Sequence, residues 1–151
     1  MIYISHRGNI NGPNKKRENS PDYLKETMKK GFNVEVDVHY KTNNFYLGHD
    51  RPKYKVKKKF LLNKKVWCHA KSILALKNLE KIKAHFFWHQ KDDVTLTNRG
   101  YFWTYPGKKL TKKSICVLPE WQNNNKGKRP RVIIKFNCAG ICSDYISDYK
   151  K

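Results

Sequence analysis

The sequence predicts an α/β fold, namely a trimmed (β/α)8 TIM barrel with several helices shortened or missing. Eight short hydrophobic runs, bounded by Gly, Pro or polar residues, are typical of strands, and two amphipathic helical patterns alternate with the early ones. Polar, chemically active side chains follow several runs, as they do at the carboxyl ends of barrel strands. The chain has 151 residues, enough for one domain over 1–151, whereas a typical barrel needs about 250. We therefore expect a reduced barrel.

The first strand and the first helix are clearly marked. Residues 2–5 form a β-branched and aromatic run that ends at His6, so His6 is expected at a strand tip. A loop rich in Gly, Pro, Asn and Lys follows over 9–19. Ser20-Pro21 then supplies an N-cap and a first helical residue, which predicts a helix over 21–30.

The next strand, expected over 32–38, turns two acids to one side. Because side chains alternate along a strand, three valines share one face, whereas Glu35 and Asp37 share the other. A turn at Asn43-Asn44 and a short return strand bring His49 back beside the strand end.

The rest of the chain is expected to continue with strands and few helices. Residues 51–65 are lysine-rich and predict an exposed loop with 60–62 tucked inward. Residues 72–83 predict an amphipathic helix, and 94–98 a short third one. The apolar face of the longer helix is expected to contain Ile73, Leu76, Leu79 and Ile82. Further strands are expected at 66–69, 86–88, 101–104, 115–118, 132–134 and 141–143.

The chain is strongly basic, with a formal net charge of +21 from 33 Lys and Arg against 12 Asp and Glu. Such a field attracts small phosphodiesters, anionic polymers such as nucleic acid, and anionic membrane surfaces. A lysine-rich coding bias with solvated side chains explains the charge equally well, and lysine is a less specific phosphate ligand than arginine. Charge alone therefore assigns no function.

Two features bear on the compartment. The N-terminal apolar run is too short for a signal peptide, and no stretch approaches the roughly 18 apolar residues of a membrane span, so a cytoplasmic location is expected. No two of the four cysteines form a C-x-x-C pair, and they are expected to be reduced, mostly buried thiols. They are Cys68, Cys116, Cys138 and Cys142.

The first fifty residues supply the groups needed to cleave a phosphodiester. The imidazoles of His6 and His49 can hold one base and one acid near neutral pH, and the planar guanidinium of Arg7 can bind phosphate oxygens. Glu35 and Asp37 offer hard oxygen ligands, which favour Mg²⁺ or Ca²⁺. The alternatives are structural histidines and two solvated surface acids, but acids are scarce here and these two interrupt a valine-rich strand.

Further residues are expected around the substrate. Lys71 could add a second positive contact to the phosphate. Glu120 and Trp121 are the best candidates to line the pocket from a later strand end, although such residues more often pack in a core or rim. Glu18 and Asn19 are expected to order a loop, with Glu18 able to approach a metal.

Six short motifs occur in order along the chain. They are His6-Arg7-Gly8, Glu18-Asn19-Ser20, Glu35-x-Asp37, His49-Asp50, His69-Ala70-Lys71 and Gly140-Ile141-Cys142-Ser143-Asp144. The series resembles the motifs of the glycerophosphodiester phosphodiesterase family, within the phosphatidylinositol-specific phospholipase C-like superfamily. Four motifs lie in the first third of the chain, and the similarity is thinner beyond it. The family usually has E-x-K where this chain has His69-Ala70-Lys71.

The resemblance implies a single domain of this family and metal-dependent hydrolysis of glycerophosphodiesters or related phospholipid-derived or glycan-linked headgroups. One histidine would deprotonate a neighbouring hydroxyl, which attacks phosphorus, and the other would protonate the departing alcohol. A cyclic phosphate would form and then be hydrolysed. Because His69 replaces a glutamate that normally binds the metal, the third ligand is imidazole, another residue or water.

Two other functions stay open. A superfamily lyase would release the cyclic phosphate as its product, and a non-catalytic protein would use the basic surface to bind nucleic acid or another anionic surface. Lost helices would also leave apolar strand surface bare, which a homo-oligomer could cover.

Overall fold

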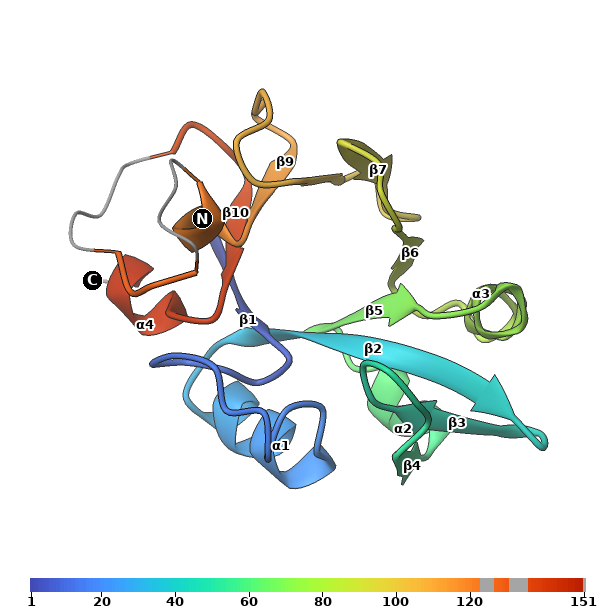
Figure 1. The fold of residues 1–151 in the computed structure, drawn as a ribbon. Coiled ribbons are helices and arrows are strands. Elements are labelled where there is room, and N and C mark those ends of the chain that lie inside the picture. The colour runs from blue at the N-terminus through green and yellow to red at the C-terminus, as the bar shows by residue number, and fades with distance from the viewer. Residues whose placement is uncertain (123–126, 131–135, 151) are drawn as a thin grey trace.

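The computed structural model describes residues 1–122, 127–130 and 136–150 (Figure 1). Its strands are β1 (Ile2–His6), β2 (Asn33–Lys41), β3 (Asn44–Leu47), β4 (Tyr54–Val56), β5 (Val66–Ala70), β6 (Phe86–Trp88), β7 (Val94–Leu96), β8 (Phe102–Thr104), β9 (Ser114–Val117) and β10 (Gly140–Ser143). Its helices are α1 (Pro21–Lys29), α2 (Lys58–Leu61), α3 (Ile73–Lys81) and α4 (Ile146–Tyr149), with a 3₁₀ turn at Pro119–Trp121. Within these described ranges, no helix has the length and apolarity needed to cross a membrane.

All ten strands belong to one sheet. Seven strands run parallel in the order β6-β5-β2-β1-β10-β9-β8. The long β2 pairs on one edge with β5 and on the other with β1 and, further along, with the antiparallel β3. β4 and β7 are added antiparallel to β3 and β8. The sheet is strongly curved, and a hydrogen bond from Thr95 Oγ1 to the Trp88 carbonyl (2.9 Å) links its β7 and β6 ends (Figure 1).

The expected trimmed (β/α)8 barrel is wrong. Over the described residues, the chain forms a mixed ten-stranded sheet with four short α-helices. Its β2–β3, β3–β4 and β7–β8 pairs are antiparallel. Parallel strands joined by a crossover helix need connections of about a dozen residues or more. The connections 89–93, 97–101 and 105–113 are shorter than that, so the strands from β6 to β9 follow one another without a helix.

Most expected strands are confirmed, with differences confined to their ends. The helix expected at 94–98 is wrong, because these residues form β7 and pair with β8. The loop expected over 51–65 contains β4 and α2, and of its apolar residues Leu61 is buried whereas Leu62 is exposed. The strand expected at 132–134 lies outside the described residues. The cysteines are free thiols as expected, and three of the four are buried.

The two faces of the sheet differ in chemistry. Val34, Val36 and Val38 are fully buried on the face that α1 and α3 cover, in a cluster with Leu24 and Leu79. The opposite face, on the inside of the curve, carries a second apolar cluster. That cluster contains Ile4, Trp67, Phe87, Trp103, Ile115, Val117 and Cys142. The predicted alternation of β2 is thus confirmed, and it turns the acids of β2 inward.

The helix α3 begins where Ser72 Oγ accepts a hydrogen bond from the Ala75 amide (3.1 Å). Its buried face is only partly the expected one. Ala75 and Leu79 are fully buried, whereas Ile73 is 71% exposed. Ile73 is the first residue of α3 and is exposed to solvent, although helical spacing alone places it on the buried face.

This difference gives a stability test. Leu79→Ala should lower the free energy of unfolding by about 2–4 kcal/mol, because it opens a cavity in the core. Ile73→Ala should change it by no more than about 0.5 kcal/mol, because the side chain is solvated. Urea titrations of both variants measure the two values, and equal losses would contradict the observed orientation of α3.

Candidate functional site

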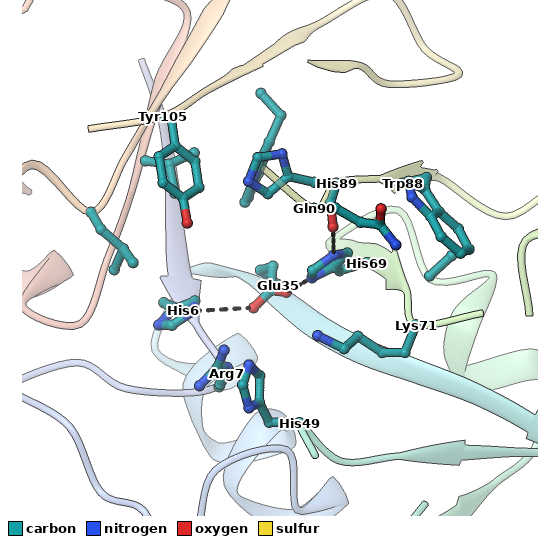
Figure 2. A pocket seen from close by; sticks show the side chains of 14 residues that line it. His6, Arg7, Glu35, His49, His69, Lys71, Trp88, His89, Gln90 and Tyr105 are labelled. Atoms are coloured by element: carbon teal, nitrogen blue, oxygen red, sulfur yellow. Dashed lines mark hydrogen bonds and ion pairs between the residues drawn. The ribbon is translucent and has the colours of Figure 1, made fainter. Parts of the chain in front are cut away.

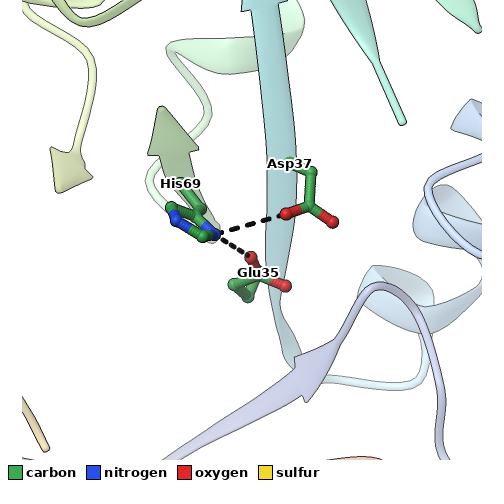
Figure 3. Close-up of side chains that lie close together, drawn as sticks. All are labelled: Glu35, Asp37 and His69. Carbon is green, nitrogen blue, oxygen red and sulfur yellow. Dashed lines mark ion pairs between the residues drawn. The ribbon is translucent and has the colours of Figure 1, made fainter. Parts of the chain in front are cut away.

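Three adjacent parallel strands deliver polar side chains to one place. The pairing of β1 with β2 aligns His6 with Glu35, and the pairing of β2 with β5 aligns Asp37 with His69. Alternation along each strand turns Glu35, Asp37 and His69 to the inside of the curved sheet (Figure 3). Residues far apart in the sequence therefore converge.

The chain leaves β1 through a tight turn that directs Arg7 to this place. Arg7 and Gly8 have φ of +54° and +97°, a region that favours glycine. A Cβ on Gly8 would lie 2.7 Å from Tyr23 Cδ1, and Thr27 Oγ1 donates a hydrogen bond to the Gly8 carbonyl (2.8 Å). The turn holds Arg7 Nε 2.9 Å from Asp37 Oδ2.

Glu35, Asp37 and His69 form a compact group of potential metal ligands (Figure 3). His69 Nδ1 lies 3.2 Å from Asp37 Oδ1 and 3.7 Å from Glu35 Oε1. One ligand atom from each residue lies within 4.8 Å of the others. Two carboxylate oxygens and one imidazole nitrogen can together hold a divalent cation.

Both carboxylates are buried and incompletely hydrogen-bonded. Glu35 Oε2 and Asp37 Oδ1 are enclosed and have no well-aligned donor among the described residues. Burial, with the charge of Asp37, raises the pKa of Glu35. Burial acts in the same direction on Asp37, but the close His69 ring and the charges of Arg7 and Lys71 outweigh it and lower the pKa of Asp37. Buried acids with free oxygens need a cation nearby, so the residues present fit a metal.

The second carboxylate oxygen of Asp37, Oδ2, is held by Asn19 as well as by Arg7. Asn19 Nδ2 donates to Asp37 Oδ2 (2.9 Å), while Asn19 Oδ1 accepts from the Asp37 amide (3.0 Å). Lys71 Nζ approaches Asp37 Oδ1 at 3.5 Å. Asn19 itself has φ of +62°, which an asparagine tolerates better than most residues. Asn19 thus holds the Asp37 carboxylate and backbone in place.

His6 is held by a carboxylate from the other end of the chain. His6 Nδ1 lies 2.8 Å from Asp144 Oδ1, which also accepts from Asn9 Nδ2 (2.7 Å). Burial alone would lower the pKa of His6, but the Asp144 hydrogen bond and the charge of Glu35 outweigh it and raise that pKa. The remaining ring nitrogen, Nε2, faces Glu35 Oε2 at 4.0 Å.

Glu120 supports Asp144 and does not line the cavity. Its carboxylate accepts from Ser143 Oγ (3.1 and 3.0 Å) and from the Asp144 amide (2.8 Å). Burial raises the pKa of Glu120, although its hydrogen bonds act in the opposite direction. Trp121 is 54% exposed and also lies away from the cavity lining. Neither residue is placed to touch a ligand there.

A cavity of about 330 Å³ opens over the cluster (Figure 2). Its polar lining includes His6, Arg7, Glu35, His49, His69 and Lys71, and its aromatic lining includes Trp88, Trp103 and Tyr105. His49 stands at the edge beside Arg7, 43% exposed, with Nδ1 2.6 Å from Asp50 Oδ1. Asp37 is fully buried and does not itself line the cavity. The structure therefore brings both histidines, the two basic side chains Arg7 and Lys71, and the candidate metal ligands to one place.

Three contributing residues were not among the expected site residues. Asp144 immediately follows β10, so its place after a parallel strand that neighbours β1 is the signal that points to it. Asn9 and the backbone carbonyl of His89, which lies 2.9 Å from His69 Nε2, act from loops. Their positions depend on loop conformation, for which the sequence carries no comparable signal.

No protein-family model matches the chain, and searches of curated proteins and of solved structures returned no match.

Repulsion between the buried carboxylates of Glu35 and Asp37 should lower the melting temperature of the metal-free protein, which can be measured. The folded-state pKa of Glu35 is raised, so the folded chain retains a proton that the unfolded chain releases, and stability falls as pH rises above the unfolded pKa. In metal-free protein at pH 7, Glu35→Gln should therefore raise the melting temperature by about 2–6 °C. The gain should disappear below about pH 4, where this carboxyl is protonated in both states.

Scanning calorimetry with EDTA measures the change, and Glu80→Gln, on the exposed side of α3, is the matched control. A lower melting temperature for Glu35→Gln at pH 7 would contradict net repulsion at this position.

Proposed function

We propose that the chain is a metal-dependent phosphodiesterase acting on glycerophosphodiesters or related headgroups through paired histidines. The observation that supports this most directly is the shared cavity. His6 and His49 line it together with Arg7, Lys71 and Glu35 of the candidate metal cluster. The motif resemblance in the sequence points to the same reaction and is independent of this geometry.

The lining matches what phosphodiester cleavage requires. The anionic diester repels a nucleophile, so a catalyst must neutralise charge and supply protons. Arg7 and Lys71 bring two positive charges to the cavity wall, each already oriented by Asp37. A divalent cation held by Glu35, Asp37 and His69 would supply further stabilisation of negative charge on the phosphoryl oxygens.

The two histidines share a feature suited to proton transfer. Nδ1 of His6 pairs with Asp144, and Nδ1 of His49 pairs with Asp50. A carboxylate at Nδ1 favours the tautomer with the proton on that nitrogen and stabilises the imidazolium. Nε2 is then the atom that exchanges a proton with a ligand in both rings.

The reaction proceeds in two balanced steps. A substrate hydroxyl next to the phosphate gives its proton to one imidazole and attacks phosphorus, while the other imidazole protonates the departing alkoxide. The resulting cyclic phosphate is opened by water, with the two imidazoles returning to their starting protonation states. A protein that stops after the first step would be a lyase.

Loss of either imidazole should remove most of the activity. His6→Ala and His49→Ala should each lower turnover of a glycerophosphodiester by about 10²–10⁴-fold, the usual contribution of a general acid or base. Phosphorus NMR follows substrate, cyclic ester and open monoester in one experiment, and a cyclic ester that persists identifies the lyase outcome.

The control for these variants is Lys77→Ala on the exposed side of α3, which should keep full turnover. Unchanged turnover in both histidine variants would refute the proposal. Absence of metal-stimulated turnover with tight, salt-sensitive duplex binding would instead favour a nucleic-acid-binding protein.

The pH dependence tests the Asp144 contact separately. Because the Asp144 hydrogen bond raises the pKa of His6, Asp144→Asn should lower that pKa and move the limb of the rate profile that His6 controls to lower pH. The limb that moves shows whether His6 acts first as acid or as base. Profiles of kcat/KM against pH provide the measurement, and two unmoved limbs would contradict the role of this pair.

A further inference from the structure

We infer that the Glu35, Asp37 and His69 cluster selects a first-row transition-metal ion, represented by Mn²⁺, over Ca²⁺. The inference takes the metal site of the proposed function further, but it does not require the phosphodiesterase reaction. It depends on which atom of His69 is available, which carboxylate oxygens are free, and how much charge surrounds them.

The hydrogen bond of His69 fixes the free nitrogen of its ring. Nε2 lies 2.9 Å from the His89 carbonyl oxygen, and because a carbonyl only accepts, Nε2 must carry a hydrogen. In the neutral ring, Nδ1 therefore carries a lone pair, which faces Asp37 and Glu35. Stacking on Phe87, with ring centroids 5.2 Å apart and planes 9° apart, holds the ring in this orientation. Metal-binding histidines are oriented by just such an outer hydrogen bond.

The carboxylates present free oxygens toward the same point. Asp37 Oδ2 is occupied by Asn19 and Arg7, which leaves Oδ1 facing His69. The Glu35 side chain is 3% exposed, and its Oε1 lies 3.7 Å from His69 Nδ1. Its other oxygen, Oε2, faces His6 and has no hydrogen-bond donor among the described residues. A lone pair on Nδ1 facing two anionic oxygens is repulsive by itself and becomes favourable when a cation lies between them.

The surrounding charge matches a divalent ion. Among the described residues, ion pairs join four carboxylates to this network, and two permanently cationic side chains belong to it. The carboxylates are Glu18, Glu35, Asp37 and Asp144, and the cationic side chains are Arg7 and Lys71. With both imidazoles neutral, two negative charges are left over. One dication balances them, and the nearby lysine and arginine disfavour any larger positive charge.

The donor set then decides between ions of the same charge. Ca²⁺ takes six to eight ligands, all of them oxygen, in a flexible shell, whereas imidazole nitrogen suits transition metals. A cluster of two carboxylates and one imidazole supplies few oxygens and one nitrogen. Mn²⁺ accepts both donor types, so this set favours it over Ca²⁺, and the sequence-based expectation of Mg²⁺ or Ca²⁺ is refined accordingly.

The test compares metal affinities and needs no substrate. Protein stripped with EDTA is titrated with Mn²⁺ and with Ca²⁺ by calorimetry, and bound Mn²⁺ is followed by electron paramagnetic resonance. Wild type should bind Mn²⁺ at least about tenfold more tightly than Ca²⁺. His69→Gln should lose about tenfold or more in Mn²⁺ affinity, the scale of change seen even for residues that only orient ligands.

His69→Glu is the decisive variant, because it makes the donor set all-oxygen. Its added negative charge strengthens the binding of both ions, so the ratio of the two affinities isolates the effect of the nitrogen. That ratio should fall by about tenfold. Glu80→Gln, remote from the site, should leave both affinities unchanged.

Equal wild-type affinities, an unchanged ratio in His69→Glu, or no binding of either ion would overturn the inference. Turnover stimulated equally by Mn²⁺ and Ca²⁺ would mark such a result as a failure of this inference alone, with the proposed function intact. Selective Mn²⁺ binding without any turnover would support the inferred metal site and contradict the proposed phosphodiesterase activity.

Discussion

The fully buried carboxylate of Asp37 connects segments that are far apart in the sequence. Arg7 reaches it from the turn after β1, Asn19 from the loop before α1, and His69 and Lys71 from β5 and its end. Without these partners, Asp37 would be a buried unpaired charge. The positions of these partners follow from the pairing of β2 with β1 and β5, so the site and the sheet register depend on each other.

The inner face of the sheet joins an apolar base to a polar edge. On the inner face of β1 and β5, Ile4 and Trp67 pack in the apolar cluster two residues before His6 and His69. The apolar base gives the sheet its stability, and it also lowers the local dielectric under the polar edge. The repulsion between Glu35 and Asp37, and the attraction of both for a cation, are therefore stronger than they would be in water. The same burial that disfavours the two acids in the empty cluster strengthens their hold on a metal.

Local patterns predicted the parts of the structure that depend on local physics. Alternation along β2 placed Glu35 and Asp37 on one face, and Ser20-Pro21 located the start of α1. Prediction was poorer where tertiary packing decides the outcome. Residues 94–96 are Val-Thr-Leu, two of which favour strands, and they pair with β8 as β7 where a short helix was expected. Ile73 satisfies the helical spacing but lies outside the contact between α3 and the sheet.

Several candidate site residues converge although the expected barrel is wrong, and the reason is physical. The candidate metal cluster, His6 and Asp144 lie on or directly after β1, β2, β5 and β10. These four strands are consecutive in the sheet and parallel, so their carboxyl ends meet at one edge. Any sheet that keeps these pairings brings His6, Glu35, His69 and Asp144 together, whatever happens to the remaining strands. The number of helices and the direction of β3, β4 and β7 concern the periphery of the sheet. The error about the whole architecture therefore did not affect these four residues, because their convergence is a property of four strands and their register. His49 differs, since it reaches the cavity from the loop after β3.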